Sequence, residues 1–185
     1  YYIDVGERIA EEQGAYLLDQ FSNPDNPLAH EQTTMPEIIE QLDGDVDAIV
    51  MGAGSSGTIA GMCNYLEKHP HKVEVVLADP VGSILARYAD TGERGEKTSG
   101  WLVEGIGKDF IPSIANFSGV KKAYTISDAE AFNTGRDLLL REGLLAGSSS
   151  GALLAAALRY CREQTEPKRV VTFACDTGNK YLSKH

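Results

Sequence analysis

Glycine and hydroxyl residues gather in one short stretch of the sequence, Gly54-Ser55-Ser56-Gly57-Thr58. Apolar residues at 48–51, typical of a buried strand, precede it, and helix-forming residues follow it. A loop of this kind exposes backbone N–H groups, and the helix that begins after it adds the positive end of its dipole. The hydroxyls of the loop can donate further hydrogen bonds. The stretch therefore predicts a site for a phosphate group.

Three interpretations of this loop stay open from its own residues. The pattern Gly52-x-Gly54-x-x-Gly57 matches the dinucleotide fingerprint, and Asp79, at the end of the next apolar run, stands where such folds bind ribose. The three hydroxyls instead favour a cup for one terminal phosphate. A doubly wound sheet also carries glycine-rich turns that bind no ligand, because short motifs of this kind give false positives.

A second turn of small residues, Gly147-Ser148-Ser149-Ser150-Gly151, also leads into a helix, and Asp176 follows the last apolar run, 169–174. In a parallel sheet, ligand-binding loops collect at the carboxyl ends of the strands. We therefore expect the loop at 54–58, the turn at 147–151 and Asp176 to lie at one edge of one sheet.

Around these turns, apolar runs alternate with amphipathic segments. This alternation predicts an α/β fold with three layers, αβα, around a mostly parallel sheet. A capping-box pattern begins at Thr34 and another at Ser127, each with a glutamate three residues later. The expected helices are 3–14, 34–44, 57–69, 127–143 and 152–162. The expected strands are 15–21, 46–51, 73–78, 101–104, 123–126 and 169–174.

Residues 22–27 are rich in Asn and Pro, which is typical of turns and linkers. We place a domain crossing there. Residues 1–27 are then the end of a small N-terminal lobe together with the crossover, and residues 28–185 form a larger, phosphate-binding lobe.

Composition narrows the classes of function. The net charge of −10 over 185 residues argues against nucleic-acid binding, because a polyanion would be repelled. We see no apolar run long enough to cross a membrane and no signal peptide. The three cysteines and four histidines have no metal-binding spacing, so we expect no metal site. Sparse cysteines suit a reducing compartment, which predicts a cytoplasmic protein.

Five stretches, in the same order along the chain, resemble the pyridoxal-phosphate enzymes of the tryptophan-synthase β fold, and in particular the cystathionine β-synthases. The cysteine synthases share much of this pattern. The stretches are Asp19-Gln20-Phe21-x-Asn23-Pro24-x-Asn26-Pro27-Leu28-Ala29-His30, Gly54-Ser55-Ser56-Gly57-Thr58, Asp79-Pro80-x-Gly82-Ser83-Ile84-Leu85, Glu104-Gly105-Ile106-Gly107-x-Asp109-Phe110-Ile111-Pro112 and Glu142-Gly143-Leu144-Leu145-x-Gly147-x-Ser149-x-Gly151.

The resemblance implies that fold, present here in part, and pyridoxal 5′-phosphate as cofactor. It implies a lyase of transsulfuration that condenses L-serine with L-homocysteine to cystathionine. It also implies site residues. The cofactor would be bound by Gly54, Ser55, Ser56, Gly57, Thr58, Ser149 and Asp176. The substrates would be bound by Gln20, Gly105, Ile106 and Gly107.

Ser149 would face the pyridine nitrogen of the cofactor, where a hydroxyl leaves the ring a weaker electron sink than a carboxylate would. From the residues alone, Ser149 could also be a helix N-cap. Ser56 stands where the family usually has glycine and adds a Cβ at a close backbone approach. Lys108 is either a rim residue that contacts the carboxylate of homocysteine or a plain solvated lysine.

The Schiff-base lysine of that family and its Asn-rich substrate loop are missing from these 185 residues, so we assign no catalytic residue. We expect the C-terminal portion of a catalytic core that needs an upstream lobe, is inactive alone and assembles as a homodimer. Two alternatives remain open. One is a cysteine synthase that uses O-acetylserine and sulfide, and the other is a non-catalytic or NAD-binding Rossmann-like domain.

Overall fold

The computed structural model describes residues 2–96 and 99–183, and it confirms the α/β class. Residues 1, 184 and 185, at the outer ends of the two predicted lobes, lie outside the described residues. No helix in the described part of the chain is both long and apolar enough to span a membrane. The elements in chain order are α1 (Tyr2–Gln13), α2 (Asp25–Ala29), a π-helical turn (His30–Thr34), α3 (Met35–Gln41), β1 (Ala48–Gly52), α4 (Gly57–Lys68), β2 (Glu74–Pro80), α5 (Leu85–Thr91), β3 (Val120–Ile126), α6 (Asp128–Glu142), α7 (Ser148–Arg162), β4 (Val170–Thr172) and a 3-10 turn (Gly178–Tyr181).

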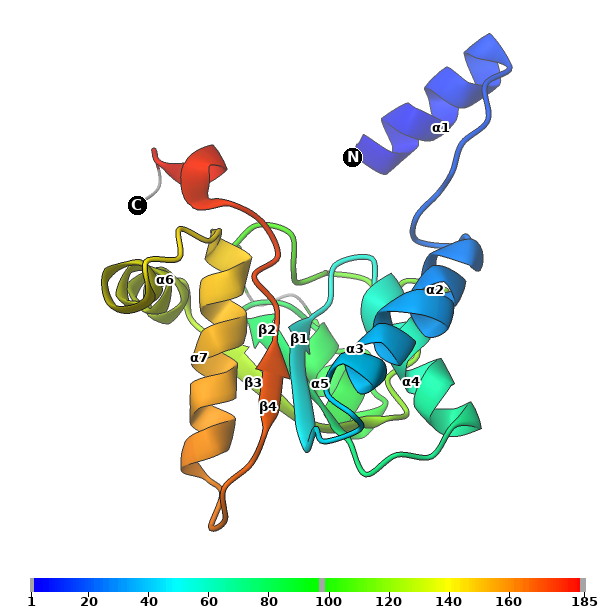
Figure 1. The fold of residues 1–185 in the computed structure, drawn as a ribbon. Coiled ribbons are helices and arrows are strands. Elements are labelled where there is room, and N and C mark those ends of the chain that lie inside the picture. The colour runs from blue at the N-terminus through cyan, green and yellow to red at the C-terminus, as the bar shows by residue number, and fades with distance from the viewer. Residues whose placement is uncertain (1, 97–98, 184–185) are drawn as a thin grey trace.

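The described strands form one parallel sheet with the order β3-β2-β1-β4 (Figure 1). In the register of the central pair, Ala48 of β1 lies opposite Glu74 of β2, and β1 also pairs with β4. Because the strands run in one direction, their carboxyl ends share one edge, the edge toward which the β4 arrow points in Figure 1. The loops that follow β1, β2 and β4 therefore begin at the same edge, where parallel sheets bind ligands.

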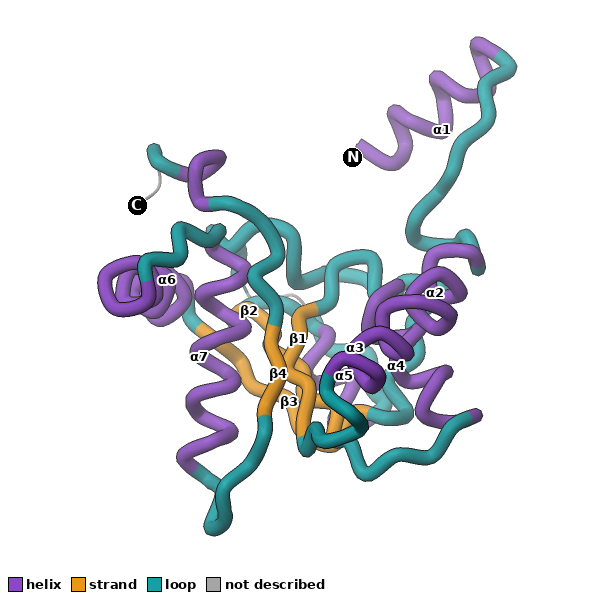
Figure 2. The backbone as a smooth tube through the Cα atoms, viewed as in Figure 1, coloured by secondary structure: helices purple, strands orange, loops and turns teal. Residues whose placement is uncertain are grey.

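Helices cover both faces of the sheet, which confirms the three-layer prediction (Figure 2). Successive side chains of β1 point to opposite faces. Val50 packs with Leu153 of α7 in one core, and Met51 packs with Ile59 of α4 in the other. All four side chains are at most 1% exposed. Each contributes about 1.5–3 kcal/mol through burial, so the two cores hold β1 and its following loop in place.

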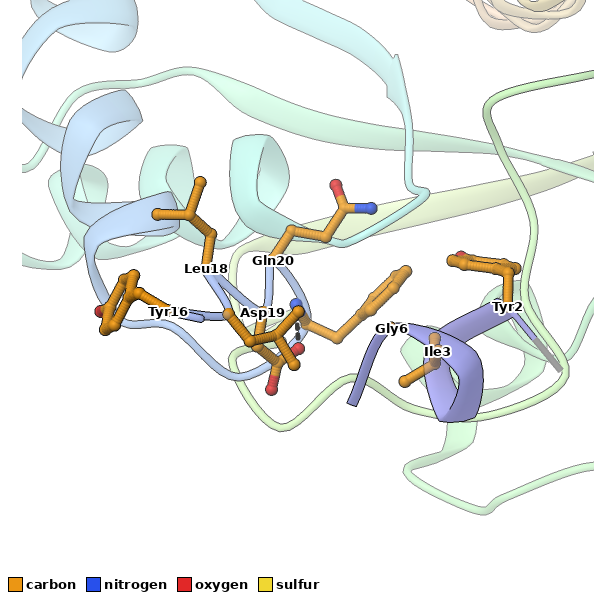
Figure 3. A pocket seen from close by; sticks show the side chains of 9 residues that line it. Tyr2, Ile3, Gly6, Tyr16, Leu18, Asp19 and Gln20 are labelled. Atoms are coloured by element: carbon orange, nitrogen blue, oxygen red, sulfur yellow. Dashed lines mark hydrogen bonds between the residues drawn. The ribbon is translucent and has the colours of Figure 1, made fainter. Parts of the chain in front are cut away.

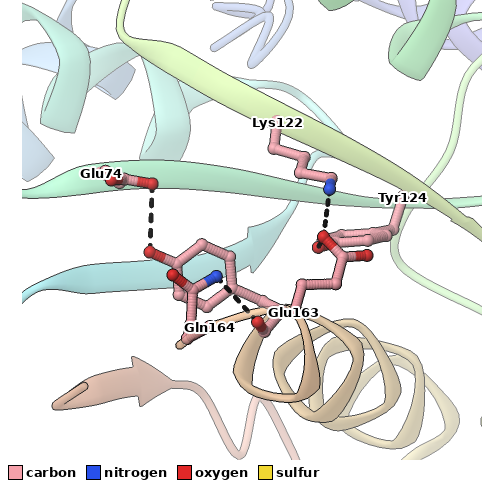
Figure 4. Close-up of polar contacts among 6 residues, drawn as sticks. Glu74, Lys122, Tyr124, Glu163 and Gln164 are labelled. Carbon is pink, nitrogen blue, oxygen red and sulfur yellow. Dashed lines mark hydrogen bonds and ion pairs between the residues drawn. The ribbon is translucent and has the colours of Figure 1, made fainter. Parts of the chain in front are cut away.

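A polar network near the amino end of β2 fastens the far end of α7 (Figure 4). The Tyr160 hydroxyl donates to Glu74 at 3.0 Å, and the Tyr124 hydroxyl donates to Glu163 at 2.9 Å. Lys122 forms an ion pair with Glu163. Burial, together with the Glu74 carboxylate, raises the pKa of Tyr160 to about 12, so this tyrosine stays a neutral donor. The network lies at the carboxyl end of α7, so the amino end of this helix, at the other edge of the sheet, takes no part in it.

The strand expected at 15–21 is wrong. Tyr16 and Leu18 are 84% and 71% exposed, and Asp19 has a φ of 38°, which bends the backbone. A strand needs a neighbour for its N–H and C=O groups, and none of the described strands pairs with this segment. The segment links α1 to the three layers as an extended arm, and α1 itself carries no buried residue.

The strand expected at 101–104 is also wrong, because side chains take its backbone donors. The amides of Leu102 and Val103 donate to Asp128 at 2.8 and 3.1 Å, and the amide of Glu104 donates to the Ser148 hydroxyl at 3.2 Å. These bonds replace a strand ladder and hold the segment beside the starts of α6 and α7.

Helix starts were predicted with mixed success. Ser127 caps α6 by accepting the Glu130 amide at 3.2 Å, as its capping box predicts. Thr34 caps no helix, because the chain is already helical before it and its φ is −62°. Residues 22–27, predicted as a turn or linker, contain the first residues of α2. Proline is tolerated in a first helical turn, so the Asn-Pro pairs here mark a helix start.

Candidate functional site

We call residues 54–58 the first turn. It connects β1 to α4 at the carboxyl edge of the sheet. Ser56 precedes α4 in a left-handed conformation, with a φ of 69°, and is only 2% exposed. Its hydroxyl oxygen is buried without a hydrogen-bond partner among the described residues. The Gly57 amide donates to the Ser55 hydroxyl at 3.3 Å, and the next amides of α4 lack intrahelical acceptors, so the turn can present donors to an anion.

Two side chains that sequence reasoning did not assign to the site support the first turn. Asn26 of α2 donates to the Ser55 hydroxyl at 3.1 Å and to the Gln20 carbonyl at 2.7 Å. His30 lies 3.2 Å from the Thr58 hydroxyl, measured from Nε2 to Oγ1. Burial lowers the pKa of His30, which favours the neutral ring. Asn26 lies in the segment 22–27, which was interpreted as a linker, and His30 begins the π-helical turn that follows α2.

We call residues 101–108 the wall segment, because it closes one side of the first turn. The Gly107 amide donates to the Ala53 carbonyl at 2.8 Å, and the Trp101 indole donates to the Ile106 carbonyl at 3.0 Å. A Cβ on Gly54 would overlap the carbonyl oxygen of Gly105. The two backbones therefore touch, and only glycine fits at position 54.

A cavity of about 500 Å³ lies between the first turn, the wall segment and the arm before α2. It is lined by Tyr2, Gln20, Phe21, Gly54, Ser55, Trp101, Val103, Glu104, Gly105, Ile106, Gly107 and Lys108. The predicted substrate residues Gln20, Gly105, Ile106 and Gly107 thus share one cavity with Gly54 and Ser55. Ser56, Gly57, Thr58, Ser149 and Asp176 do not line it.

A second cavity of about 440 Å³ adjoins the first and shares Tyr2, Gln20 and Phe21 with it. Figure 3 shows Tyr2 and Ile3 of α1 across from Tyr16, Leu18 and Gln20 of the arm. Its lining is mostly apolar and comes from α1 and from the arm, which lie outside the three layers.

We call residues 147–151 the second turn. The predicted helix 152–162 starts earlier than expected, because α7 begins at Ser148 and residues 148–151 form its first turn. The serines of the second turn have different partners. Ser148 accepts the amide of Glu104 in the wall segment, and Ser150 accepts the amide of Cys175 at 2.9 Å. Ser149 is 7% exposed, and its hydroxyl has no hydrogen bond to the described residues. The N-cap of α7 is Gly147, so the interpretation of Ser149 as an N-cap is wrong.

Asp176 lies against the second turn. Its carbonyl accepts the Gly147 amide at 2.9 Å, and its carboxylate accepts the Tyr181 hydroxyl at 2.6 Å. That hydrogen bond raises the pKa of Tyr181 to about 12. The other carboxylate oxygen of Asp176 is buried and unpartnered among the described residues. The wall segment contacts both turns, so the structure brings the first turn, the second turn and Asp176 to one edge, as the sequence predicted.

Asp79 cannot bind a ribose. Its side chain is fully buried, and one carboxylate oxygen accepts the Ala86 amide at 2.8 Å. Burial raises its pKa to about 6. The acid that supported the dinucleotide interpretation therefore serves the start of α5 and does not reach the cavity. Among the described residues, no group of three or more His, Cys, Asp or Glu side chains could hold a metal ion.

Comparisons with known proteins agree with this geometry. A family model described as "Pyridoxal-phosphate dependent enzyme" matches residues 2–176. The chain is 39% identical over 184 residues to the cystathionine beta-synthase of Apis mellifera, covering 99% of this chain and 36% of that one. It is 41% identical over 170 residues to a cysteine synthase of Helicobacter pylori, covering 92% and 53%.

A crystal structure of O-acetylserine dependent cystathionine beta-synthase from Helicobacter pylori is also similar. The TM-score is 0.86 at 38% identity, with 99% of this chain and 57% of that chain covered. The chain therefore spans between about a third and somewhat more than half of the length of these proteins.

Proposed function

This chain belongs to the pyridoxal-phosphate-dependent enzyme family, and from that premise we propose that the protein carrying it catalyses a β-replacement on an amino acid. In the specific form of the proposal, the β-hydroxyl of L-serine leaves and the sulfur of L-homocysteine takes its place. The products are cystathionine and water. The reaction would make the protein a lyase of transsulfuration.

One observation carries the proposal: the first turn and the wall segment enclose a single cavity with Gln20. The first turn fits a phosphate ester, because Ser56 offers a buried hydroxyl without a partner and α4 offers its first amides. The wall segment lines the same cavity through residues that include Gly105, Ile106 and Gly107. A phosphate-bearing cofactor and a small amino acid can thus be held side by side.

When bound, pyridoxal phosphate withdraws electrons from the α-carbon of an amino acid, which eases loss of a β-substituent. The residues of this chain have separate tasks around it. Gly54, Ser55, Ser56, Gly57 and Thr58 bind the phosphate. Ser149 would offer a neutral hydroxyl to the pyridine nitrogen. Asp176 is the other cofactor-binding residue of the proposal, and its carbonyl also accepts the Gly147 amide of the second turn. Gln20 and the stretch 105–107 orient the two substrates.

The Schiff-base lysine remains to be placed, and we propose that a lobe outside these 185 residues supplies it. The isolated chain is then inactive. We further propose a homodimer located in the cytoplasm. The division at residue 27 between two lobes is part of the same proposal, because α1 and the arm pack little against the three layers.

An assay of the intact protein tests this function. Purified protein is incubated with L-serine and L-homocysteine, and separately with O-acetylserine and sulfide, and the products are identified by mass spectrometry. We expect cystathionine from the first pair. Cysteine as the only product would favour the cysteine synthase alternative, which the similarity to the Helicobacter pylori enzyme supports. No product from either pair would overturn the proposal.

The place of the lysine has a separate test. The cofactor is reduced onto its lysine with borohydride, and the modified peptide is mapped. We expect the modified lysine to lie outside the 185 residues. A modified lysine within them would overturn the proposed division of labour.

A further inference from the structure

Lys108 ends the wall segment, and its backbone is fixed at three points. The Lys108 amide donates to the Ser83 hydroxyl at 2.9 Å, and the Lys108 carbonyl accepts from Ser83 at 3.1 Å and from the Ile84 amide at 2.9 Å. The residue before it, Gly107, is bonded to Ala53 next to the first turn. The side chain of Lys108 therefore starts from a rigid point at the cavity.

Aromatic rings hold the ammonium group of Lys108. Its Nζ lies 4.6 Å from the ring centre of Phe21, 5.5 Å from that of Phe110 and 5.9 Å from that of Tyr2. It also donates to the Tyr2 hydroxyl at 3.4 Å. Cation–π attraction to ring faces fixes the position of an ammonium group but leaves its remaining N–H donors available. The interpretation of Lys108 as a plain solvated lysine is therefore wrong.

The charge of Lys108 has no counterion among the described residues. None of the carboxylates in residues 2–96 and 99–183 forms an ion pair with it. Among the described residues that line the cavity, Lys108 carries the positive charge and Glu104 the negative charge. In a chain of net charge −10, a fixed and unpaired ammonium at a cavity is a local attraction for an anion.

We propose that Lys108 binds the carboxylate of the second substrate and so selects an amino-acid thiol over inorganic sulfide. This inference rests on the proposed β-replacement. Gly105, Ile106 and Gly107 line the same cavity as Lys108, and Gly105 contacts Gly54 of the first turn. A thiol substrate whose carboxylate is held at Lys108 would therefore lie along the wall segment. Sulfide has no carboxylate and gains nothing from the lysine.

The test uses the intact, cofactor-loaded protein and three variants. Lys108→Met removes the charge at similar length, Lys108→Arg keeps it, and Lys121→Met is the control, because Lys121 is exposed on β3. With Lys108→Met, we expect KM for homocysteine to rise about tenfold, since a charge-assisted hydrogen bond is lost, with kcat within twofold. KM for sulfide and for the amino-acid donor should stay unchanged. Lys108→Arg should stay within about threefold of the wild type.

A binding measurement makes the test independent of turnover. L-Methionine is the S-methyl thioether of homocysteine and carries the same carboxylate without a free thiol. Calorimetry should give about tenfold weaker methionine binding for Lys108→Met and no change for Lys121→Met. Lys108→Gln serves as a second uncharged variant if Lys108→Met folds poorly, as judged by circular dichroism.

Three outcomes would overturn the inference: unchanged homocysteine KM and methionine affinity, an equal loss with sulfide, or a loss confined to the amino-acid donor. If the wild type forms no product with either nucleophile, the proposed function fails. The role of Lys108 is then judged by the calorimetry alone.

Discussion

The first and second turns are both short runs of glycine and serine at the same edge of the sheet, yet they are built in different ways. The first turn bends through a left-handed Ser56, whose buried hydroxyl has no partner among the described residues, just before α4. The second turn starts α7 from an extended Gly147, and two of its three serines are used to bind neighbouring segments.

The difference shows that similar composition can serve two kinds of recognition. A turn with free amides suits a phosphate, which accepts hydrogen bonds from several directions. A turn with one free hydroxyl between two anchored ones suits a single atom of a ligand, because the anchors fix where Ser149 lies. Five substitutions separate these two tasks.

Gly54→Ala should have the largest effect. The new Cβ would overlap the backbone carbonyl of Gly105. Neither this carbonyl nor the Cβ can rotate away as a flexible side chain would, so the backbone of the first turn or of the wall segment must shift. Overpacking of this kind costs about 1–3 kcal/mol, which corresponds to about five- to 150-fold weaker cofactor binding if the whole cost falls on the cofactor-bound state. Titration of the cofactor-free intact protein with pyridoxal phosphate measures this. Gly100→Ala is the control, because a Cβ there meets no atom within 4 Å. Equal affinity in the two variants would contradict the tight contact.

Ser149→Ala and Ser150→Ala should show which serine of the second turn contacts the cofactor and which one stabilises the fold. Ser149→Ala removes a hydroxyl without a protein partner, so we expect cofactor affinity or kcat to fall about fivefold with little change in melting temperature. Ser150→Ala removes the acceptor of the Cys175 amide, so we expect a loss of about 1 kcal/mol in the free energy of unfolding with cofactor affinity retained. The opposite assignment of the two effects would show that Ser149 is structural.

Ser56→Gly should increase the free energy of unfolding of the cofactor-free protein and weaken cofactor binding. Glycine relieves the left-handed strain at position 56, so the cofactor-free protein should gain about 0.5–1 kcal/mol in the free energy of unfolding. The variant also loses the buried hydroxyl, so cofactor binding should weaken about threefold. Denaturant unfolding with and without cofactor measures both. A gain in both quantities would mean that the hydroxyl does not contact the phosphate.

His30→Gln should have the smallest effect and concerns pH. Burial lowers the pKa of His30, so the unfolded chain binds this proton more readily than the folded chain does. The stability that neutral His30 contributes is complete above about pH 6.5 and is lost as pH falls through the lowered pKa. Melting temperatures across pH 5 to 8 should fall more steeply toward acid in the wild type than in His30→Gln. Parallel profiles would exclude His30 as the titrating support of the first turn.

The core of the fold could be predicted because its signals are local. The apolar run of β1, the glycines after it and the spacing of apolar residues in α4 lie within one stretch of chain. The failed predictions have distant causes. Residues 102 and 103 do not form a strand because Asp128 accepts their amides, and the sequence of that segment contains no sign of it.

The site residues also fall into those that the sequence could predict and those that it could not. The first turn, the second turn and Asp176 could be placed at one edge because parallel strands end together. Asn26 and His30 could not be assigned, because their roles depend on how α2 packs on the first turn. Proline in that segment favoured a linker, although proline is equally suited to a first helical turn.

Trp101 is the one tryptophan among these 185 residues, and its indole is bonded to the Ile106 carbonyl inside the wall of the cavity. Its ultraviolet emission therefore originates beside the place where a light-absorbing vitamin would be held. Energy transfer from the indole would dim that emission as the cavity fills. The fluorescence of Trp101 can thus report whether the cavity is filled, without an attached label.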